Sequence, residues 1–483
     1  MRIEEKIKVL ERVALQLEPD QIQRSELRDQ VIDYTEEFLE NINENKAFIQ
    51  TDHKGKAIYD HPISEEPQPL NELINIFKEN VEKTGLNPAS GGHLAYIPGG
   101  GLYPSSLGDY IADITNRYAG VFYPSPGAVR MENMLINWMR DEIGYPDTAA
   151  GNLTSGGSIA NLIGIVTARD AFNLQSKNFH KVVIYLTEQV HHSVMKSIRI
   201  AGLYNAQIRH VPMDDHFRMD VDHLEELIKT DKEHGLQPWL IIASAGTTDT
   251  GAVDPIDKIA DIKDEHNLWL HVDGAYGGFF ILCDEGKKII KGLDRTDSIV
   301  MDPHKGLFLP YGTGIVLIKD RKLLFQSHYY KANYLQDAEK FDEELSPADL
   351  SPELTKHYRG LRMWLPLKLF GLKPFRAGLE EKIWLARYFY EEIQKIEGFE
   401  VGSYPDLSVV TYRFMPKDGK PNEFNQKLLD LILEDGRVFL SSTMIGDKFY
   451  LRLAVLCFRS HKEIVDLALE VLKEKSKILV ERD

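Results

Sequence analysis

The sequence has 483 residues, 43% hydrophobic and 27% charged, so the chain can form two or three domains with a large core, as soluble globular proteins do. Its net charge of −17 argues against non-specific nucleic-acid binding and against docking on anionic membranes, because both require basic surfaces. The two cysteines, Cys283 and Cys457, form no CxxC pair, which fits a cytoplasmic protein without disulfides or cysteine zinc sites. No apolar run approaches membrane-spanning length, and no secretory signal is expected.

Apolar residues recur at helical spacing in three N-terminal segments, 2–17, 25–42 and 69–84. Ser25 is the predicted N-cap of the second helix, without a capping box, because the third position on is Arg28. The three helices carry too few apolar residues for a core of their own. Residues 1–87 are therefore predicted to form a helical arm that packs on another surface, such as a second copy of the chain.

A stretch rich in glycine and proline follows, from residue 87 to 126. Glycine lets the backbone approach a ligand closely, and aromatic or polar-tipped side chains line small-molecule sites. A plain surface loop is the alternative. We expect four residues of this stretch to line a substrate pocket: His93, Tyr96, Phe122 and Tyr123.

From about residue 151 the pattern is that of an α/β fold, in which strands alternate with helices. Strands are predicted at 181–186, 208–211, 239–245, 268–273, 298–301 and 314–318, and helices at 158–172, 193–203, 221–233 and 255–266. Asp220 and Asp254 are the expected N-caps of the last two helices. Such alternation predicts right-handed βαβ units, a largely parallel sheet, and a ligand site at the carboxyl ends of its strands.

A long segment of weak periodicity, about 327–353, comes after the last of these strands. Loops of this length are usually functional or solvated, and the many acidic residues fit either interpretation. We favour a mobile lid with Tyr334 at its head. Helices and strands return after residue 356, which predicts a small α/β domain at 373–483 beside a large domain at 88–372.

The strand predicted at 298–301 runs through a proline turn onto Lys305. Lysine is rarely buried, so a lysine at the end of a core strand calls for a chemical reason. A desolvated lysine loses its proton more readily, and its neutral amine can form a Schiff base with the carbonyl of pyridoxal 5'-phosphate (PLP). A lysine that only ends the strand and points to water is the plain alternative.

Three other motifs supply what such a cofactor needs. Gly156 and Gly157 precede a predicted helix, where free backbone amides and the helix dipole form an anion site. Asp273 ends a core strand, and a buried carboxylate needs a partner such as a protonated pyridine nitrogen. His191 and His192 follow another strand, and either imidazole could stack on a flat ring. An ordinary turn, a helix-capping aspartate and a structural histidine are the alternatives. No metal is expected, because no metal-ligand spacing is found.

The order of these motifs resembles that of the group II PLP-dependent decarboxylases, which include aromatic amino acid, glutamate, tyrosine and cysteine-sulfinate decarboxylases. The resemblance covers residues from about 25 to 460. It is carried by the motifs Thr154-Ser-Gly-Gly-Ser158, Gln189-Val-His191, Gly246-Thr-Thr248, His271-Val-Asp273-Gly-Ala275-Tyr and Asp302-Pro-His304-Lys305-Gly.

This resemblance implies a type I fold, like that of aspartate aminotransferase, and a homodimer with active sites at the interface. Lys305 would form the Schiff base, Asp273 would keep the pyridine nitrogen protonated, and His191 would stack on the ring. Tyr334 would return a proton to the substrate carbon. The residues implied for the rest of the cofactor are Gly156, Gly157, Ser158, Ser298 and His304 at the phosphate, with Ala275 and Thr248 at the ring. Asp302 departs from the asparagine that many members carry, and it is left out of the phosphate site.

The implied reaction is decarboxylation of an L-amino acid to the amine and CO2. An aromatic substrate is favoured by the aromatic residues of the glycine-rich stretch and by the acidic lid, although Arg117 or Arg130 could bind an acidic side chain. Arg452 could instead anchor a substrate carboxylate, as in an aminotransferase. A carbon–carbon lyase, and a regulator that binds the cofactor without catalysis, are further alternatives.

Overall fold

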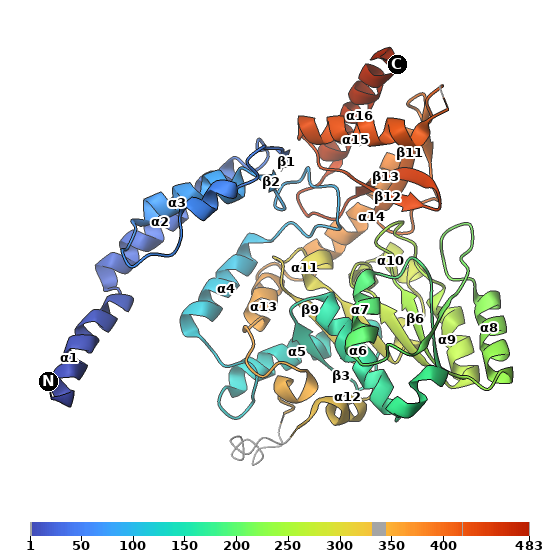
Figure 1. The fold of residues 1–483 in the computed structure, drawn as a ribbon, viewed down its shortest axis with the longest axis horizontal. Coiled ribbons are helices and arrows are strands. Elements are labelled where there is room, and N and C mark those ends of the chain that lie inside the picture. Colours follow the sequence, from blue (N-terminus) through green and yellow to red (C-terminus); the bar gives the residue numbers. More distant parts are fainter. Residues whose placement is uncertain (1, 331–343, 418, 483) are drawn as a thin grey trace.

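A computed structural model describes residues 2–330, 344–417 and 419–482 (Figure 1). These residues form a seven-stranded sheet, a four-stranded sheet, a small two-stranded sheet and an N-terminal helical arm. The predicted α/β architecture is confirmed. In the described part of the chain, no helix combines the length and the apolar character that crossing a membrane would require.

The seven-stranded sheet has the strand order β3-β9-β8-β7-β6-β4-β5. Its strands are β3 (Ala150–Thr154), β4 (Val182–Leu186), β5 (Gln207–His210), β6 (Gln237–Ser244), β7 (Trp269–Asp273), β8 (Ser298–Met301) and β9 (Gly314–Ile318). β9 runs antiparallel to both of its neighbours, and all other neighbouring pairs are parallel, so the sheet is largely parallel as predicted. The sequence did not predict β3, because its Gly151 and Asn152 are disfavoured in strands.

Helices cover both faces of this sheet. The helices of one face are α6 (Gly157–Ala171), α7 (His192–Ile200) and α12 (Arg321–His328). Those of the other face are α5 (Pro126–Ile143), α8 (Val221–Glu233) and α9 (Ile256–His266). The remaining helices near the sheet are α4 (Tyr103–Thr115), α10 (Asp284–Ile289), α11 (Pro303–Gly306) and α13 (Gly360–Phe370).

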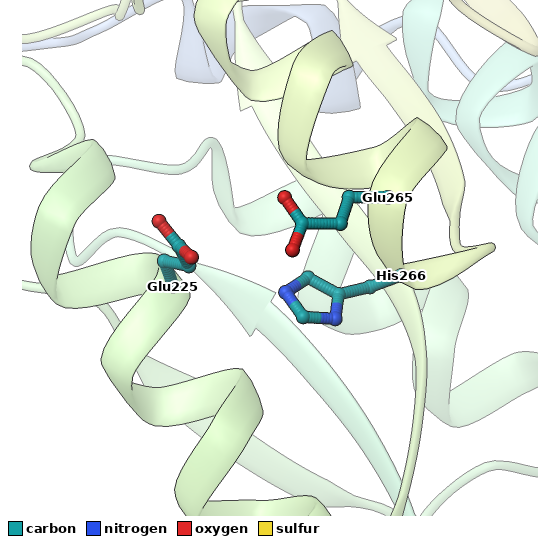
Figure 2. Close-up of side chains that lie close together, drawn as sticks. All are labelled: Glu225, Glu265 and His266. Carbon is teal, nitrogen blue, oxygen red and sulfur yellow. The ribbon is translucent and has the colours of Figure 1, made fainter.

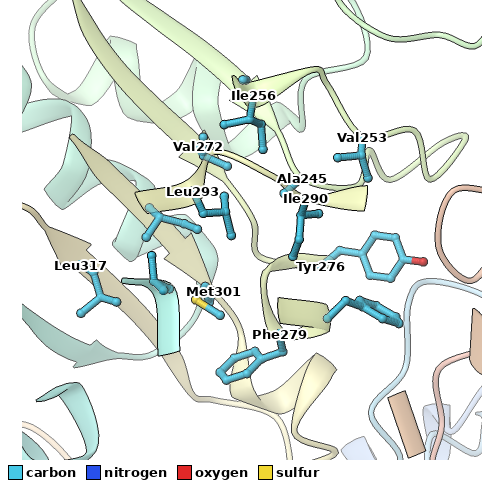
Figure 3. Close-up of a cluster of buried hydrophobic side chains, with 14 of the residues drawn as sticks. Ala245, Val253, Ile256, Val272, Tyr276, Phe279, Ile290, Leu293, Met301 and Leu317 are labelled. Carbon is cyan, nitrogen blue, oxygen red and sulfur yellow. The ribbon is translucent and has the colours of Figure 1, made fainter. Parts of the chain in front are cut away.

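Strand alternation decides which side chains meet which helices. On β7, Leu270 and Val272 join the core under α8 and α9, part of which is shown in Figure 3. The intervening residues Trp269, His271 and Asp273 face α6 instead. Polar groups of β7 are thereby collected beneath one helix.

The two predicted aspartate caps differ in the structure. Asp220 caps α8 as predicted, because its carboxylate accepts hydrogen bonds from the first backbone amides of that helix. Asp254 does not cap α9. Its buried carboxylate accepts from the backbone amides of Met219 and Ser244, at 2.7 Å each, and joins β6 to the loop before α8.

The four-stranded sheet is antiparallel, with the order β10-β11-β13-β12. Its strands are β10 (Phe399–Val401), β11 (Val409–Phe414), β12 (Ser441–Ile445) and β13 (Lys448–Ala454). The helices α14 (Lys373–Ile393), α15 (Pro421–Asp435) and α16 (Lys462–Arg482) share a separate hydrophobic core with it. The exact domain limits at residues 87 and 372 stay a prediction.

The N-terminal arm projects from the rest of the chain in Figure 1 and consists of α1 (Ile3–Ala14), α2 (Gln21–Glu40) and α3 (Leu70–Phe77). None of these helices has a buried residue. The predicted start of α2 at Ser25 is wrong. Asp20 is its N-cap and accepts from the backbone amides of Ile22 and Gln23, and Gln23 completes a capping box.

After the short strands β1 (Phe48–Ile49) and β2 (Gly85–Leu86), residues 89–101 cross to the small sheet, and we call this segment the strap. The backbone of Leu94 donates to Phe439 (3.0 Å) and accepts from Ala454 (2.8 Å), and its side chain is buried in the small core. Further along, Gly99 lies against the main chain of His304, where a Cβ would come within 2.2 Å of the carbonyl oxygen. The strap thus joins the small sheet to the turn that carries Lys305.

Candidate active site

A cavity of about 310 Å³ opens at the carboxyl ends of β4, β6, β7 and β8, against the N-terminus of α6. This is the position at which parallel sheets bind ligands. It brings together nine of the ten residues predicted to bind the cofactor: Gly156, Gly157, Ser158, His191, Thr248, Asp273, Ala275, His304 and Lys305.

Lys305 lies on α11, a single turn that begins at Pro303 directly after β8. Its backbone amide donates to the carbonyl of Asp302 (2.9 Å), which fixes the turn. The side-chain amine lies 3.2 Å from Oδ2 of Asp302, whose side chain is almost fully buried. Lys305 therefore ends inside the cavity, and the alternative of a lysine pointing to bulk water does not hold.

Asp273 ends β7 and is buried at the floor of the cavity. Its Oδ1 accepts from the backbone amide of Ala275 (3.1 Å), and its Oδ2 accepts from the side-chain amide of Asn161 (3.0 Å). A carboxylate has about four acceptor positions, so these two bonds hold its orientation and leave capacity for a ligand.

His191 is the N-cap of α7. Its Nδ1 accepts from the backbone amide of Ser193 (3.3 Å) and lies 2.8 Å from the hydroxyl of the same residue. Burial lowers the pKa of His191 below its usual value, and the nearby carboxylate of Asp273 partly offsets this. The ring is therefore neutral near pH 7 and held at the cavity wall.

The cavity reaches the start of α6, where the sequence predicted an anion site. At Gly157, a Cβ would lie 3.1 Å both from the Cβ of Ala275 and from Oδ2 of Asp302, so a side chain would crowd this end of the cavity. His304 donates through Nδ1 to the carbonyl of Thr313 (2.6 Å), and its Nε2 lies 3.6 Å from Oδ2 of Asp302. Backbone amides of a fifteen-residue helix are free here for an anion.

Ser298 is the tenth predicted cofactor residue, and the structure corrects its role. It lies at the beginning of β8 rather than at its end, is fully buried, and does not line the cavity. Its hydroxyl accepts from the indole N–H of Trp269 (2.8 Å) and lies 2.7 Å from Nδ1 of His271. Ser298 therefore has no place in a phosphate site.

Thr248 lies in a loop that Arg452 ties to the small sheet. The guanidinium of Arg452 donates to the backbone carbonyls of Thr248 and Asp249, and to the hydroxyl of Ser441 (2.8 Å). Because desolvation opposes its charge, burial lowers the pKa of Arg452. This arginine is used by protein acceptors, which disfavours the predicted role as an anchor for a substrate carboxylate.

The structure does not bring the four predicted substrate-pocket residues to the cavity. His93 is fully buried against Phe439, and burial lowers its pKa to about 4. Phe122 is also buried, whereas Tyr96 and Tyr123 are 60% and 52% exposed. Within one chain, His93 and Phe122 therefore lie in the interior, and Tyr96 and Tyr123 lie at the surface.

Tyr334 lies outside the described residues, together with the greater part of the predicted lid. Its predicted role as a proton donor stays a prediction.

Sequence reasoning did not identify Asn161 and Ser193, which both line the cavity. The amide nitrogen of Asn161 lies 3.2 Å from the Ser193 hydroxyl as well as 3.0 Å from Asp273. One signal was available: Asn161 follows Ser158 by three positions, so both lie on the same face of the predicted helix.

Outside the cavity, Glu225 on α8 and Glu265 and His266 on α9 lie close together (Figure 2). Each has a ligand atom within 4.8 Å of the others, a spacing compatible with a metal ion. However, Lys229 forms an ion pair with Glu225, and the ammonium of Lys232 lies 2.9 Å from Nδ1 of His266. Two positive charges thus already occupy this surface cluster.

A sequence profile described as "Pyridoxal-dependent decarboxylase conserved domain" matches residues 53–415. The chain belongs to this family. Its members decarboxylate amino acids with PLP, so the protein is a PLP-dependent carboxy-lyase, and the predicted family and cofactor are confirmed.

Relatives within the pyridoxal-dependent decarboxylase family are named for different substrates. The chain is 33% identical over 406 residues to an aromatic-L-amino-acid decarboxylase from Bacillus atrophaeus, a match that covers 83% of this chain and 84% of the relative. It is 29% identical over 437 residues to an L-2,4-diaminobutyrate decarboxylase from Acinetobacter baumannii, covering 85% and 84%. A crystal structure of Oryza sativa TDC with PLP and tryptamine superposes with a TM-score of 0.89 at 23% identity, covering 96% of this chain and 99% of the other. This last likeness supports the type I fold.

The cavity fits PLP on its own chemistry. It contains one lysine amine for the aldehyde, the buried carboxylate of Asp273 for the pyridine nitrogen, and a neutral imidazole at the wall. A second buried carboxylate, that of Asp302, lies 3.2 Å from the lysine amine. At the other end, Gly157 leaves the space that a phosphate needs, beside the helix N-terminus. Oδ1 of Asp302 is buried there without a hydrogen-bond partner in the described structure.

Proposed function

We propose that the protein decarboxylates an aromatic L-amino acid to the corresponding amine and CO2. The observation that carries this proposal is the convergence of Lys305, Asp273 and His191 on one cavity at the strand ends. The similarity to an aromatic-L-amino-acid decarboxylase supports the substrate class.

When bound, PLP supplies an electron-withdrawing ring that accepts the electron pair of a bond broken at the substrate α-carbon. Asp273 keeps a proton on the ring nitrogen, because its fixed, buried carboxylate favours a positively charged partner. Lys305 would hold the cofactor through its aldehyde carbon, because its side-chain amine ends in the cavity beside Asp302 (3.2 Å). His191 would lie against the cofactor at the cavity wall, where Ser193 holds its ring.

Gly156, Gly157 and Ser158 at the start of α6 would hold the phosphate, with His304 beside it. Ala275 and Thr248, which also line the cavity, would contact the cofactor ring. Apart from Ser298, this is the set of cofactor residues predicted from the sequence.

Tyr334 is proposed to deliver the proton that replaces the carboxylate, on the strength of the family resemblance. A Tyr334→Phe variant keeps the ring and loses the acidic hydroxyl. We expect it to bind PLP normally and to form amine at least tenfold more slowly. Unchanged rate and product would contradict the role.

Transamination is the alternative on the same fold. It requires a carboxylate anchor in the plane of the cofactor ring, and Arg452 was the candidate. Its three protein acceptors support a structural role instead.

The decisive experiment loads the purified protein with PLP and offers single amino acids, with CO2, amine and keto acid measured separately. L-Tryptophan, L-phenylalanine and L-tyrosine are expected to give CO2 and amine with higher kcat/KM than L-glutamate or L-2,4-diaminobutyrate. Keto acid without CO2 would refute decarboxylation. Preference for diaminobutyrate would refute only the substrate class.

Lys305→Ala tests the covalent role of the lysine, with Lys322→Ala on the exposed side of α12 as its control. The first variant should lose the PLP adduct that borohydride traps in the wild type, and the control should retain it. An adduct that persists in Lys305→Ala would rule out this lysine.

We also propose that the protein works as a homodimer through its arm. The apolar residues of the first helical segment recur on one face and are exposed in the single chain, with Leu10 at 58%, Val13 at 61% and Leu17 at 87%. Leu10→Glu should yield monomers in sedimentation or light scattering, whereas Lys8→Glu on the same helix should not. A monomeric wild type would refute the proposal.

A cytoplasmic location is proposed from the cysteines. Cys283 and Cys457 are both free and buried, as expected where thiols stay reduced. Microscopy of the fluorescently tagged protein in its source cells, if it placed the protein outside the cytoplasm, would overturn this assignment.

A further inference from the structure

Five buried side chains form a continuous hydrogen-bonded chain that leads to the cavity. The indole N–H of Trp269 lies 2.8 Å from the hydroxyl of Ser298, which lies 2.7 Å from Nδ1 of His271. Nε2 of His271 lies 2.9 Å from Oδ1 of Asn161, whose Nδ2 lies 3.0 Å from Asp273. Only the last two of these residues line the cavity.

The direction of every bond in this chain follows from its two ends. An indole N–H can only donate, and an ionised carboxylate can only accept. The amide nitrogen of Asn161 must therefore face Asp273, which turns its oxygen toward His271. That oxygen requires a proton on Nε2 of His271.

The middle of the chain is consistent with this direction. Burial lowers the pKa of His271 to about 4, so its ring carries a single proton near pH 7. With that proton on Nε2, Nδ1 accepts from the hydroxyl of Ser298. Ser298 in turn accepts from Trp269, so no donor meets another donor.

Asn161 also begins a second branch. Its Nδ2 has another hydrogen, which it donates to the hydroxyl of Ser193 (3.2 Å). The hydroxyl of Ser193 donates its own proton to Nδ1 of His191 (2.8 Å), and the backbone amide of Ser193 points at the same nitrogen. With Nδ1 accepting, the proton of the neutral imidazole must lie on Nε2.

We propose that Asn161 and His271 are positioning residues, which together fix the carboxylate of Asp273 and hold His191 as the Nε2–H tautomer. Asn161 is the branch point, because its two N–H groups reach the two cofactor-facing side chains and its oxygen is oriented by His271. The importance of these two residues for catalysis rests on the proposed function of Asp273 and His191. The directions of the hydrogen bonds do not depend on that proposed function.

The test is nitrogen-15 NMR of histidine-labelled, cofactor-free protein, combined with a PLP titration followed by fluorescence. In the wild type, His191 and His271 should both show a protonated Nε2 and an unprotonated Nδ1, and His271 should stay neutral at pH 5.5. A proton on Nδ1 of either residue would overturn the inference. It would leave the proposed decarboxylation untouched, because that is measured separately by CO2 release.

Variants separate positioning from mere packing. Asn161→Leu should release His191 into a mixture of tautomers and weaken PLP binding roughly tenfold or more, as expected when an ionic hydrogen bond is lost. The control is Thr167→Val, on the same helix, which removes a buried hydroxyl bonded to Ser327 (3.1 Å) and should change neither readout.

A conservative substitution at position 271 tests whether the hydrogen bonds of His271 are what matters. His271→Gln keeps one donor and one acceptor and should retain the His191 tautomer and PLP affinity within about threefold, whereas His271→Leu should lose both. Equal behaviour of the glutamine and leucine variants would refute the inference. The wild-type spectrum decides the tautomers even where a variant does not fold.

Discussion

Gly164 offers a direct way to disturb the hydrogen-bonded chain without removing any of its members. It lies in the middle of α6, directly over the ring of His271. A Cβ at this position would come within 2.6 Å of Cε1 and 2.9 Å of Nδ1 of the imidazole. Gly164→Ala must therefore push the ring of a fully buried histidine that is bonded at both nitrogens.

Three contributions set the size of the effect. Alanine gains up to about 1 kcal/mol over glycine in a helix interior. Overpacking of a close-packed core costs about 1–3 kcal/mol. Displacing the ring leaves a buried donor or acceptor of His271 without its partner, which costs about 1–3 kcal/mol for each group. We expect a net destabilisation of about 1–5 kcal/mol and weaker PLP binding.

Gly127→Ala is the matched control. Gly127 is also helical, in α5, and a Cβ there meets nothing within 4 Å. The midpoint temperature of thermal unfolding should fall for Gly164→Ala, and it should stay the same or rise for Gly127→Ala. Equal stability and equal PLP affinity of the two variants would refute the reasoning about the ring of His271.

Three further changes are predicted. Burial raises the pKa of Asp254 to about 6, above its unfolded value, so its contribution to the free energy of unfolding should fall by about 2 kcal/mol from pH 4 to pH 6. Urea titrations of wild type and Asp254→Asn should differ in that window, and a pH-independent difference would contradict this. Arg452→Met leaves the carbonyl of Thr248 unpaired and should cost about 1–3 kcal/mol, visible in thermal unfolding, with unchanged stability as the contrary result. Gly157→Ala should weaken PLP binding about tenfold in a fluorescence titration while the fold persists, because its Cβ would press on Ala275; unchanged affinity would disprove that crowding.

Much of the central sheet could be predicted because its strands are short apolar runs between turn residues. β8, β9 and α8 begin and end at the predicted residues. In contrast, α4 was hidden in the glycine-rich stretch. Pro104 is compatible with the first turn of a helix, and Gly108 lets the backbone of Leu361 approach, where a Cβ would lie 2.7 Å from its carbonyl oxygen.

Some residues of the candidate active site could be predicted from the sequence, and others could not. Lys305, Asp273 and His191 could be predicted because residues that follow parallel strands meet at one edge of the sheet. Ser298 could not be placed from its motif, since it begins β8 and three further strand residues of about 3.3 Å each separate it from that edge. The contact between Asn161 and His271 joins residues 110 positions apart and depends on how α6 lies over β7.

The strap has a consequence for how the chain folds during synthesis. Its backbone partners, Phe439, Ala454 and Phe458, are made about 350 residues after Leu94 and Gly99. Until then, the strap has no strand to pair with, whereas the seven-stranded sheet can already close behind the ribosome. Contacts of such sequence separation form late and slowly. The turn that bears Lys305 therefore receives its last support only after β13 and Phe458 have been made.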